Sequence, residues 1–194
     1  MLNSIFGGLS RAIELQNIKG HTNHDYENDR DILVVVDMQP DFTASQNRRT
    51  IAAVKEEVRG ARTRNEEIII VEYVNCEPTD SRITDLTKDY EKVKTVVKID
   101  NDGSEEILKI LKESAIDQEG IVPHLRICGV NTNACVRETV KGLKRKLNPP
   151  FQIDVIGDAC NERYSSAQEH LMSLLELKDP QQTHLHVFHR GSEL

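Results

Sequence analysis

The sequence predicts an α/β protein in which helices cover both faces of a mostly parallel sheet. Short apolar runs of strand length alternate along the chain with longer stretches of helix length, which is the order of β-α units joined by right-handed crossovers. Residues 32–36 are all apolar, as in a strand that is buried on both faces of a parallel sheet. The 194 residues, of which 38% are hydrophobic, suit a single domain with one core.

Six strands and four helices are expected, in alternating order. The strands cover residues 32–37, 68–74, 95–98, 125–130, 151–156 and 184–188. The helices cover residues 47–63, 104–113, 135–147 and 162–177. The third helix stops before two prolines, because proline cannot donate to the helical hydrogen-bond ladder. This order predicts a three-layer α/β/α architecture around a six-stranded, Rossmann-like sheet, in which ligands bind beyond the carboxyl ends of the strands.

The first 29 residues stand apart from this pattern. Residues 10–16 can form a short amphipathic helix, and residues 19–30 are polar and resemble a linker. We interpret residues 1–29 as an arm that is either disordered or wrapped around a neighbouring subunit.

Charge and composition exclude several classes of partner. The net charge is -7, and the basic cluster Lys141, Lys144, Arg145 and Lys146 falls at the end of a predicted helix, where cations complement the helix dipole. We therefore expect no nucleic-acid partner. The four cysteines lack close paired spacing, and no apolar run is long enough to cross a membrane. These features predict a soluble, cytoplasmic protein without a membrane partner.

Three chemically active side chains fall at the ends of predicted strands. They are Asp37, Lys98 and Cys135. Cys135 lies where a helix is expected to begin, so the helix dipole should make its thiol more acidic than a free cysteine, whose pKa is about 8.5. Taken singly, each residue also has an ordinary interpretation: a helix-capping aspartate, a surface lysine and a buried cysteine without chemistry.

Together these segments resemble the isochorismatase-like cysteine hydrolases. The resemblance rests on Val-Val-Asp37-Met-Gln-Pro-Asp-Phe, on a lysine at a later strand end, and on Gly129-Val-Asn-Thr-Asn-Ala-Cys135-Val. The segment Val155-Ile-Gly-Asp-Ala-Cys160 also matches a strand of that family that ends in Asp-Ala. The match runs from about residue 30 to residue 190, so we assign residues 30–194 to a hydrolase domain.

The resemblance implies a mechanism for the three residues. Cys135 would be the nucleophile, Asp37 would take its proton and deliver it to the leaving group, and Lys98 would stabilise both anions. Burial should raise the pKa of Asp37, since an ordinary carboxylate is a poor base towards a thiol. The family's cis peptide maps to Val130-Asn131, so the amides of Asn131 and Cys135 would form the oxyanion hole. For Thr132 we expect a helix-capping role rather than a loop brace.

One departure from the family concerns metal. Its nicotinamidase branch binds a divalent metal through an Asp-x-His pair after the second strand, whereas this chain has Asn75-Cys76-Glu77 there and no histidine between His24 and His124. We therefore expect no metal and no cofactor, and the sequence disfavours nicotinamidase activity. His184, His186 and His189 alternate on one strand, and we interpret them as an exposed strand end rather than a metal site.

The substrate pocket is the least defined part of the site. Candidates chosen only by their proximity to the strand ends are Phe42, Tyr73, Asn75, Glu77 and Tyr164, and for each of them ordinary packing or surface placement is an equal alternative.

The sequence favours hydrolysis of a carbon-nitrogen bond in a small amide or ureido compound through a Cys135 thioester. The alternatives are vinyl ether hydrolysis of the isochorismatase type, and a catalytically silent protein that binds small molecules. From the family and the N-terminal arm we also expect a homo-oligomer, either a dimer or a tetramer.

Overall fold

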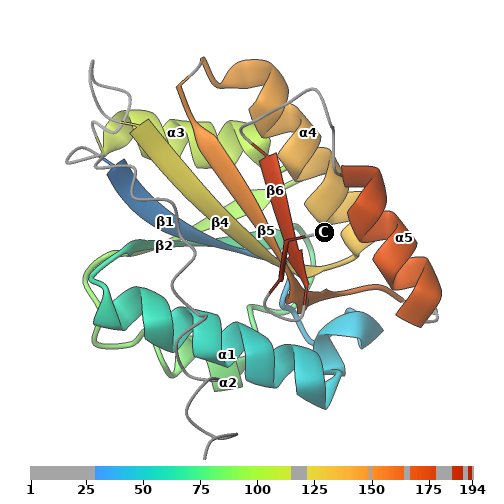
Figure 1. The fold of residues 1–194 in the computed structure, drawn as a ribbon. Helices are drawn as coiled ribbons and strands as arrows, with labels where there is room; N and C mark the ends of the chain where they lie inside the picture. The colour runs from blue at the N-terminus through green and yellow to red at the C-terminus, as the bar shows by residue number, and fades with distance from the viewer. Residues whose placement is uncertain are drawn as a thin grey trace, which may run out of the picture.

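The computed structural model describes residues 29–114, 122–148, 150–163, 167–177, 185–189 and 192–193. One sheet runs through these residues in the strand order β3-β2-β1-β4-β5-β6-β7, with every neighbouring pair parallel except β6 and β7 (Figure 1). The strands are β1 (Asp29–Val36), β2 (Glu67–Tyr73), β3 (Val93–Lys98), β4 (Val122–Val130), β5 (Gln152–Asn161), β6 (Leu185–His189) and β7 (Ser192–Glu193).

Helices cover both faces of this sheet, as the sequence predicts (Figure 1). The elements on one face are η1 (Thr43–Gln46), α1 (Arg48–Thr63) and α2 (Ser81–Thr84). Those on the other face are α3 (Ser104–Glu113), η2 (Thr132–Val136), α4 (Arg137–Lys146) and α5 (Ala167–Leu177). The three-layer α/β/α fold is therefore confirmed, with a short antiparallel β7 added to the six predicted strands.

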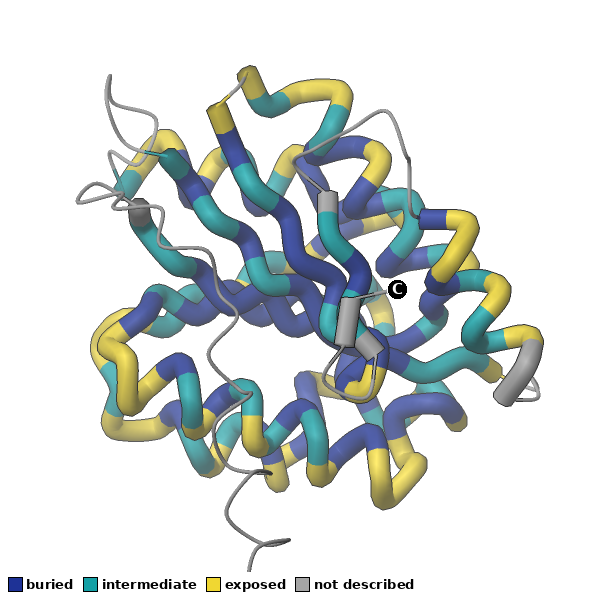
Figure 2. Tube along the Cα trace, viewed as in Figure 1, coloured by how far each residue is buried: buried dark blue, intermediate teal, exposed yellow. Residues whose placement is uncertain are grey.

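The core has two halves because successive residues of each central strand point to opposite faces. On β1, Ile32, Val34 and Val36 pack towards α3, α4 and α5, whereas Leu33 and Val35 pack towards α1. All five are fully buried, and Figure 2 shows the sheet interior as its most buried part. The unbroken apolar run of the sequence thus becomes the central strand.

The chain departs from the sequence prediction around Gly129. Its φ of 132° lies in the region open to glycine, and a Cβ there would stand 2.0 Å from the carbonyl oxygen of Val36. The β4–β5 register shifts at this point, so that Gly129 pairs with Cys160 and Val130 with Asn161. This second stretch of pairing extends β5 to Asn161, beyond the predicted end at residue 156, and α5 begins at Ala167 rather than at residue 162.

The first strand begins earlier than predicted. β1 starts at Asp29 and not at residue 32, so it includes the last residue of the predicted arm. Residues 1–28 lie outside the described part of the chain. In the described ranges no helix has the length and apolarity needed to cross a membrane.

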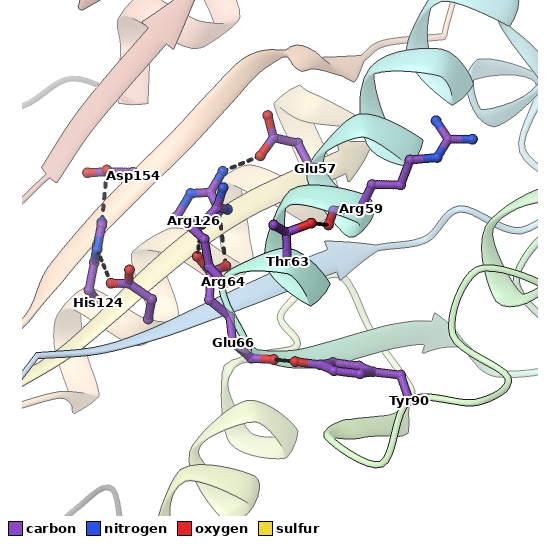
Figure 3. A network of polar contacts seen from close by, with 10 residues as sticks. Glu57, Arg59, Thr63, Arg64, Glu66, Tyr90, His124, Arg126 and Asp154 are labelled. Carbon is purple, nitrogen blue, oxygen red and sulfur yellow. Dashed lines mark hydrogen bonds and ion pairs between the residues drawn. The ribbon is translucent and has the colours of Figure 1, made fainter.

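Charged side chains form a network towards the amino ends of the strands, on the face covered by α1 (Figure 3). The ring of His124 lies between Asp31, 2.7 Å from Nδ1, and Asp154, 2.8 Å from Nε2. Beside it, the guanidinium of Arg126 binds the carboxylates of Glu57 and Glu66. We call these six residues the amino-end network.

Candidate active site

The three predicted catalytic residues meet at the carboxyl edge of the sheet. Asp37 follows β1, Lys98 ends β3, and Cys135 lies in η2, after β4. Lys98 Nζ is 3.0 Å from Asp37 Oδ2, and both side chains are fully buried. The thiol of Cys135 is also buried and interacts with both of them. The structure therefore brings together the trio that the sequence places about 40 to 60 residues apart.

The side chain of Lys98 passes over the ring of Tyr73 on its way to Asp37. In the strand order β2 stands between β3 and β1, so the lysine side chain must cross the end of β2. Tyr73 is the last residue of β2, and Lys98 Nζ lies 4.7 Å from the centre of its ring. A cation over an aromatic ring gains electrostatic stabilisation, more so when solvent is excluded. The ammonium also donates to the carbonyl oxygen of Asp100 at 3.0 Å.

Asp37 has an unusual backbone and an under-satisfied carboxylate. Its φ is 54°, in the left-handed region, and its amide donates to the carbonyl oxygen of Val71 at 2.8 Å. Apart from the nearby ammonium of Lys98, neither carboxylate oxygen receives a hydrogen bond of ordinary geometry. Burial raises the pKa of Asp37, and Lys98 opposes the rise only in part. The predicted rise in the pKa of Asp37 is confirmed.

The predicted acidity of Cys135 is wrong. Burial, followed by the negative charge of Asp37, raises the pKa of the thiol to about 12, although Lys98 acts in the opposite sense. The helix-dipole argument assumed a thiol at the first turn of an α-helix, whereas Cys135 is the fourth residue of the π-helical turn η2 and is buried. Desolvation outweighs the dipole there, because the charged form loses its hydration.

Two asparagine side chains flank the thiol. The thiol donates to Asn101 Oδ1 at 3.5 Å, and Asn131 Nδ2 approaches the sulfur at 3.9 Å. The sequence singled out Asn131 only for its backbone amide, and it missed Asn101 altogether. The available signal was that Asn101 lies three residues beyond Lys98, in the loop at the same edge of the sheet.

The loop that carries Cys135 is held by its own hydrogen bonds. Asn131 adopts φ 61° and ψ 57°, and its carbonyl oxygen accepts from the amides of Ala134 and Val136 at 2.9 and 3.3 Å. Thr132 donates through its hydroxyl to the carbonyl oxygen of Asn161 at 3.0 Å. It therefore braces η2 against the end of β5 and does not cap the helix, contrary to the sequence prediction.

The pocket candidates separate into two groups. Tyr73 contacts Lys98, and Phe42 meets the Tyr73 ring edge to face, with 6.3 Å between the centroids. Asn75 and Glu77 are exposed in the turn after β2. Tyr164 lies outside the described residues.

A buried glutamine that sequence reasoning missed fixes the turn after β2. Gln39 Nε2 donates to the carbonyl oxygens of Tyr73 and Glu77 at 3.0 and 2.7 Å, and Gln39 Oε1 accepts from the amide of Tyr73 at 2.6 Å. The turn is thereby anchored to the segment that follows Asp37. Gln39 lies two residues after Asp37 in the matched motif, and this position was the signal that could have identified it.

The residues after β2 do not suit a metal ion. Asn75 and Glu77 lie in an exposed turn whose backbone is bound by Gln39, and among the described residues no group of three or more His, Cys, Asp and Glu side chains has ligand geometry. The histidine strand β6 is described only in part: the ring of His186 stacks on Phe188 with centroids 6.3 Å apart, and His184 lies outside the described residues. We assign no metal to either region.

A separate hollow of about 230 Å³ lies far from the trio. Residues from the amino ends of three strands line it, among them Arg30, Glu67 and Lys94. The carboxyl ends that bear Asp37 and Lys98 lie at the opposite edge of the sheet. We therefore locate the candidate active site by its chemistry and not by this hollow.

Comparison with known proteins identifies the chain's relatives. The isochorismatase domain family matches residues 31–184. No curated protein sequence matches the chain.

Several solved structures share the fold. They include the nicotinamidase SaPncA of Staphylococcus aureus (TM-score 0.62, 18% identity, covering 78% of this chain and 94% of that one). They also include an isochorismatase of Pseudomonas putida (TM-score 0.61, 15% identity, 84% and 88% covered). A third is the MAR1 ribonuclease of Caenorhabditis elegans (TM-score 0.60, 17% identity, 76% and 72% covered). At these identities the likeness shows a common fold.

Proposed function

The chain belongs to the isochorismatase family of hydrolases, and from this premise we propose that it cleaves a carbon-nitrogen bond of a small amide or ureido compound through a thioester on Cys135. One observation carries the proposal: the buried ion pair of Lys98 and Asp37, 3.0 Å apart, interacts with a buried thiol. A buried ion pair is costly to maintain and is weak evidence for stability. Its place beside a nucleophile favours a chemical role.

The mechanism begins with a proton transfer between two coupled groups. The thiol of Cys135 is protonated at rest, because burial and the charge of Asp37 raise its pKa. When Asp37 accepts that proton, its negative charge disappears, and Lys98 remains as the charged neighbour of the new thiolate. The transfer thus removes one of the causes that opposed ionisation, and the raised pKa of Asp37 makes the carboxylate a better base.

Acyl transfer then follows with all atoms accounted for. The sulfur bonds to the carbonyl carbon, and the backbone amides of Asn131 and Cys135 stabilise the oxyanion that forms. As the carbon-nitrogen bond breaks, Asp37 delivers its proton to the nitrogen, so the nitrogen of a primary amide leaves as ammonia. Water then attacks the thioester, Asp37 takes one water proton and returns it to the sulfur, and the acyl group leaves as a carboxylic acid.

Ammonia release and acyl-enzyme mass test this proposal. Wild-type protein and Cys135→Ala are assayed against small carboxamides and ureido acids, and rapidly quenched wild type is analysed by intact and peptide mass spectrometry. We expect ammonia from at least one substrate and an acyl adduct on the Cys135 peptide. An adduct on another cysteine, or full activity in Cys135→Ala, would contradict it.

Vinyl ether hydrolysis is the second candidate, and one observation favours it. A thiol with a pKa of about 12 is a reluctant nucleophile, whereas a buried aspartic acid with a raised pKa can protonate an enol ether. In this case Cys135→Ala retains most of the activity and Asp37→Asn loses it. A third possibility, a silent binding protein, predicts no turnover from either class of substrate.

We also propose that the protein acts without nucleic acid and as a cytoplasmic homo-oligomer. Acidic side chains neutralise much of the basic cluster on α4: Lys146 binds Glu105 at 2.8 Å, and Lys141 lies 3.6 Å from Glu138. The exposed apolar side chains of Val97 and Ile99, at the edge strand β3, support self-association. Light scattering at micromolar concentration tests the oligomer, and a monomer would contradict it.

A further inference from the structure

The thiol of Cys135 contacts two carboxamides, those of Asn101 and Asn131, that are less buried than the ion pair. Asp37 and Lys98 are fully buried, whereas Asn101 is exposed and Asn131 is partly exposed. A molecule that approaches the sulfur from solvent therefore meets the two carboxamides before it meets the ion pair.

The two carboxamides offer opposite hydrogen-bonding groups to such a molecule. Asn101 turns its acceptor towards the thiol, with Oδ1 3.5 Å from Sγ, and Asn131 turns its donor, with Nδ2 3.9 Å from the same sulfur. An amide bears an oxygen that accepts and, unless it is doubly substituted, a nitrogen that donates. Placed with its carbonyl carbon on the sulfur, an amide would find a donor for its oxygen and an acceptor for its N–H.

Both asparagines are held in place by the structure around the nucleophile. The carbonyl oxygen of Asn131 accepts two amides of η2, the turn that carries Cys135. The carbonyl oxygen of Asn101 accepts from the hydroxyl of Thr139 on α4 at 3.4 Å, and the preceding carbonyl, of Asp100, accepts from Lys98. Because these bonds join both loops to the trio, the donor and the acceptor keep their positions relative to the sulfur.

We propose that Asn101 and Asn131 are specificity residues that recognise the two halves of the scissile amide. Asn131 Nδ2 donates to the carbonyl oxygen, and Asn101 Oδ1 accepts an N–H of the leaving nitrogen. The preferred substrates are carboxamides and ureido compounds whose scissile nitrogen bears at least one N–H. This inference rests on the proposed function and narrows it, because a tertiary amide or an ester lacks the N–H that Asn101 requires.

The same contact assists the leaving group. When the sulfur bonds to the carbonyl carbon, the nitrogen must keep its lone pair turned towards the proton on Asp37. An N–H held by Asn101 Oδ1 orients that lone pair. The C–N bond then breaks as the proton moves from Asp37 to nitrogen, the acyl group stays on sulfur, and no further reactant is needed until water hydrolyses the thioester.

A competition assay tests the pair with model compounds in place of the natural substrate. p-Nitrophenyl acetate acylates the protein, the rate is followed by nitrophenolate release, and peptide mass spectrometry locates the acetyl group. Benzamide, N-methylbenzamide and N,N-dimethylbenzamide are added as competitors. In wild type we expect the first two to protect Cys135 at concentrations about tenfold lower than the third, as for one hydrogen bond to a neutral group.

Variants separate recognition from structural support. The readout is the ratio of two inhibition constants, that of N,N-dimethylbenzamide divided by that of benzamide. Asn101→Leu should bring this ratio to about one, whereas Asn101→Asp, which keeps the acceptor, should preserve the wild-type ratio. Asn148→Leu, an exposed site after α4, serves as the matched control. A ratio measured within one variant is unaffected by a general change in thiol reactivity.

The outcomes distinguish the two proposals. If the ester does not acylate Cys135, the proposed function fails. If Cys135 is acylated but the three amides protect equally, or Asn101→Leu keeps the wild-type ratio, the inference about Asn101 is overturned while the nucleophile stands.

Discussion

Two aspartates at opposite ends of β1 have pKa values that are shifted in opposite directions. Asp31, near the amino end of β1, has a lowered pKa, mainly because it shares a hydrogen bond with His124. Asp37, just beyond the carboxyl end, has a raised pKa, because burial outweighs the attraction of Lys98. The difference lies in the partners available to each carboxylate.

The amino-end network and the trio divide their roles accordingly. In the network, His124 and Arg126 each bind two acids, so every one of the four carboxylates has a cationic hydrogen-bond partner (Figure 3). In the trio, Asp37 has a single cation and lacks hydrogen bonds of ordinary geometry. Satisfied charges stabilise a fold, whereas an under-satisfied charge stays ready to take up a proton. The comparison predicts that substitutions in the first region alter stability and those in the second alter chemistry.

The largest expected effect is on catalysis. Cys135→Ala and Asp37→Asn should each lower kcat for amide hydrolysis by about 10⁴-fold, equivalent to about 5 kcal/mol of activation free energy, and the double variant should lose little more. The reason is that in the proposed mechanism the two residues act as one unit in proton transfer and attack. Steady-state ammonia release measures all three, and additive losses would break the assignment of a shared step.

Arg126→Met should have the largest effect on stability. It leaves Glu57 without its cation and Glu66 with only the half-exposed Arg64. The side chains that lose their pairing are mostly buried, with 18%, 23% and 3% exposed for Arg126, Glu57 and Glu66. We expect the free energy of unfolding to fall by about 3 kcal/mol with kcat unchanged.

Urea unfolding measures this loss, with Arg59→Met as the control. Arg59 pairs with Glu56 in solvent, and its loss should cost about 0.5 kcal/mol or less. Equal effects of the two arginine variants would remove the distinction between buried and surface pairs.

The pH dependence of stability should report His124. Burial alone would lower its pKa, but hydrogen bonds to Asp154 and Asp31 raise it to about 9. A raised pKa means that the contribution is complete below the unfolded value of about 6.5 and disappears as pH rises through 9. We expect a loss of about 2 kcal/mol over this window, after allowance for screening, since the Asp31 side chain is 41% exposed.

Urea unfolding at pH 6 and pH 10, compared with His124→Gln, isolates this effect. The variant should lose the slope between the two pH values. Because the pKa of Asp31 is lowered, its own contribution should be complete above the ordinary carboxyl value of about 4 and should fade in stronger acid, as pH falls through the lowered pKa. A wild-type slope that persists in the variant would assign the pH dependence to other groups.

The smallest expected effect is a gain in stability when the ion pair of the trio is removed. Replacing the ion pair by apolar side chains, Asp37→Leu with Lys98→Met, should raise the free energy of unfolding by about 1 to 2 kcal/mol and abolish activity. Lys98→Met alone should destabilise, because it leaves a buried carboxylate unpaired. If the double variant is less stable than wild type, the trio contributes to the fold and the division of roles is wrong.

The central strand and the candidate catalytic residues could be predicted from local sequence patterns. The apolar run of residues 32–36 predicted the central strand. An acid, a lysine and a thiol at the ends of three strands pointed to the trio, because parallel strands bring their carboxyl ends together. Periodicity alone could not find the register shift at Gly129, which extends β5, nor the π-helical turn that holds Cys135. The first depends on how closely β4 approaches β1, and the second is held by hydrogen bonds that include one to the distant Asn161.

The sequence by itself determined the layer order of the fold and the chemical types of the catalytic candidates, because side-chain periodicity and strand ends are local properties. Only the tertiary structure decided their electrostatics. The same helix-start argument that predicts an acidic Cys135 fails once the thiol is buried beside Asp37, and Asn101 joins it only through a loop 34 residues away. Desolvation and neighbouring charge depend on segments distant in the chain, so a pKa is a property of the assembled site.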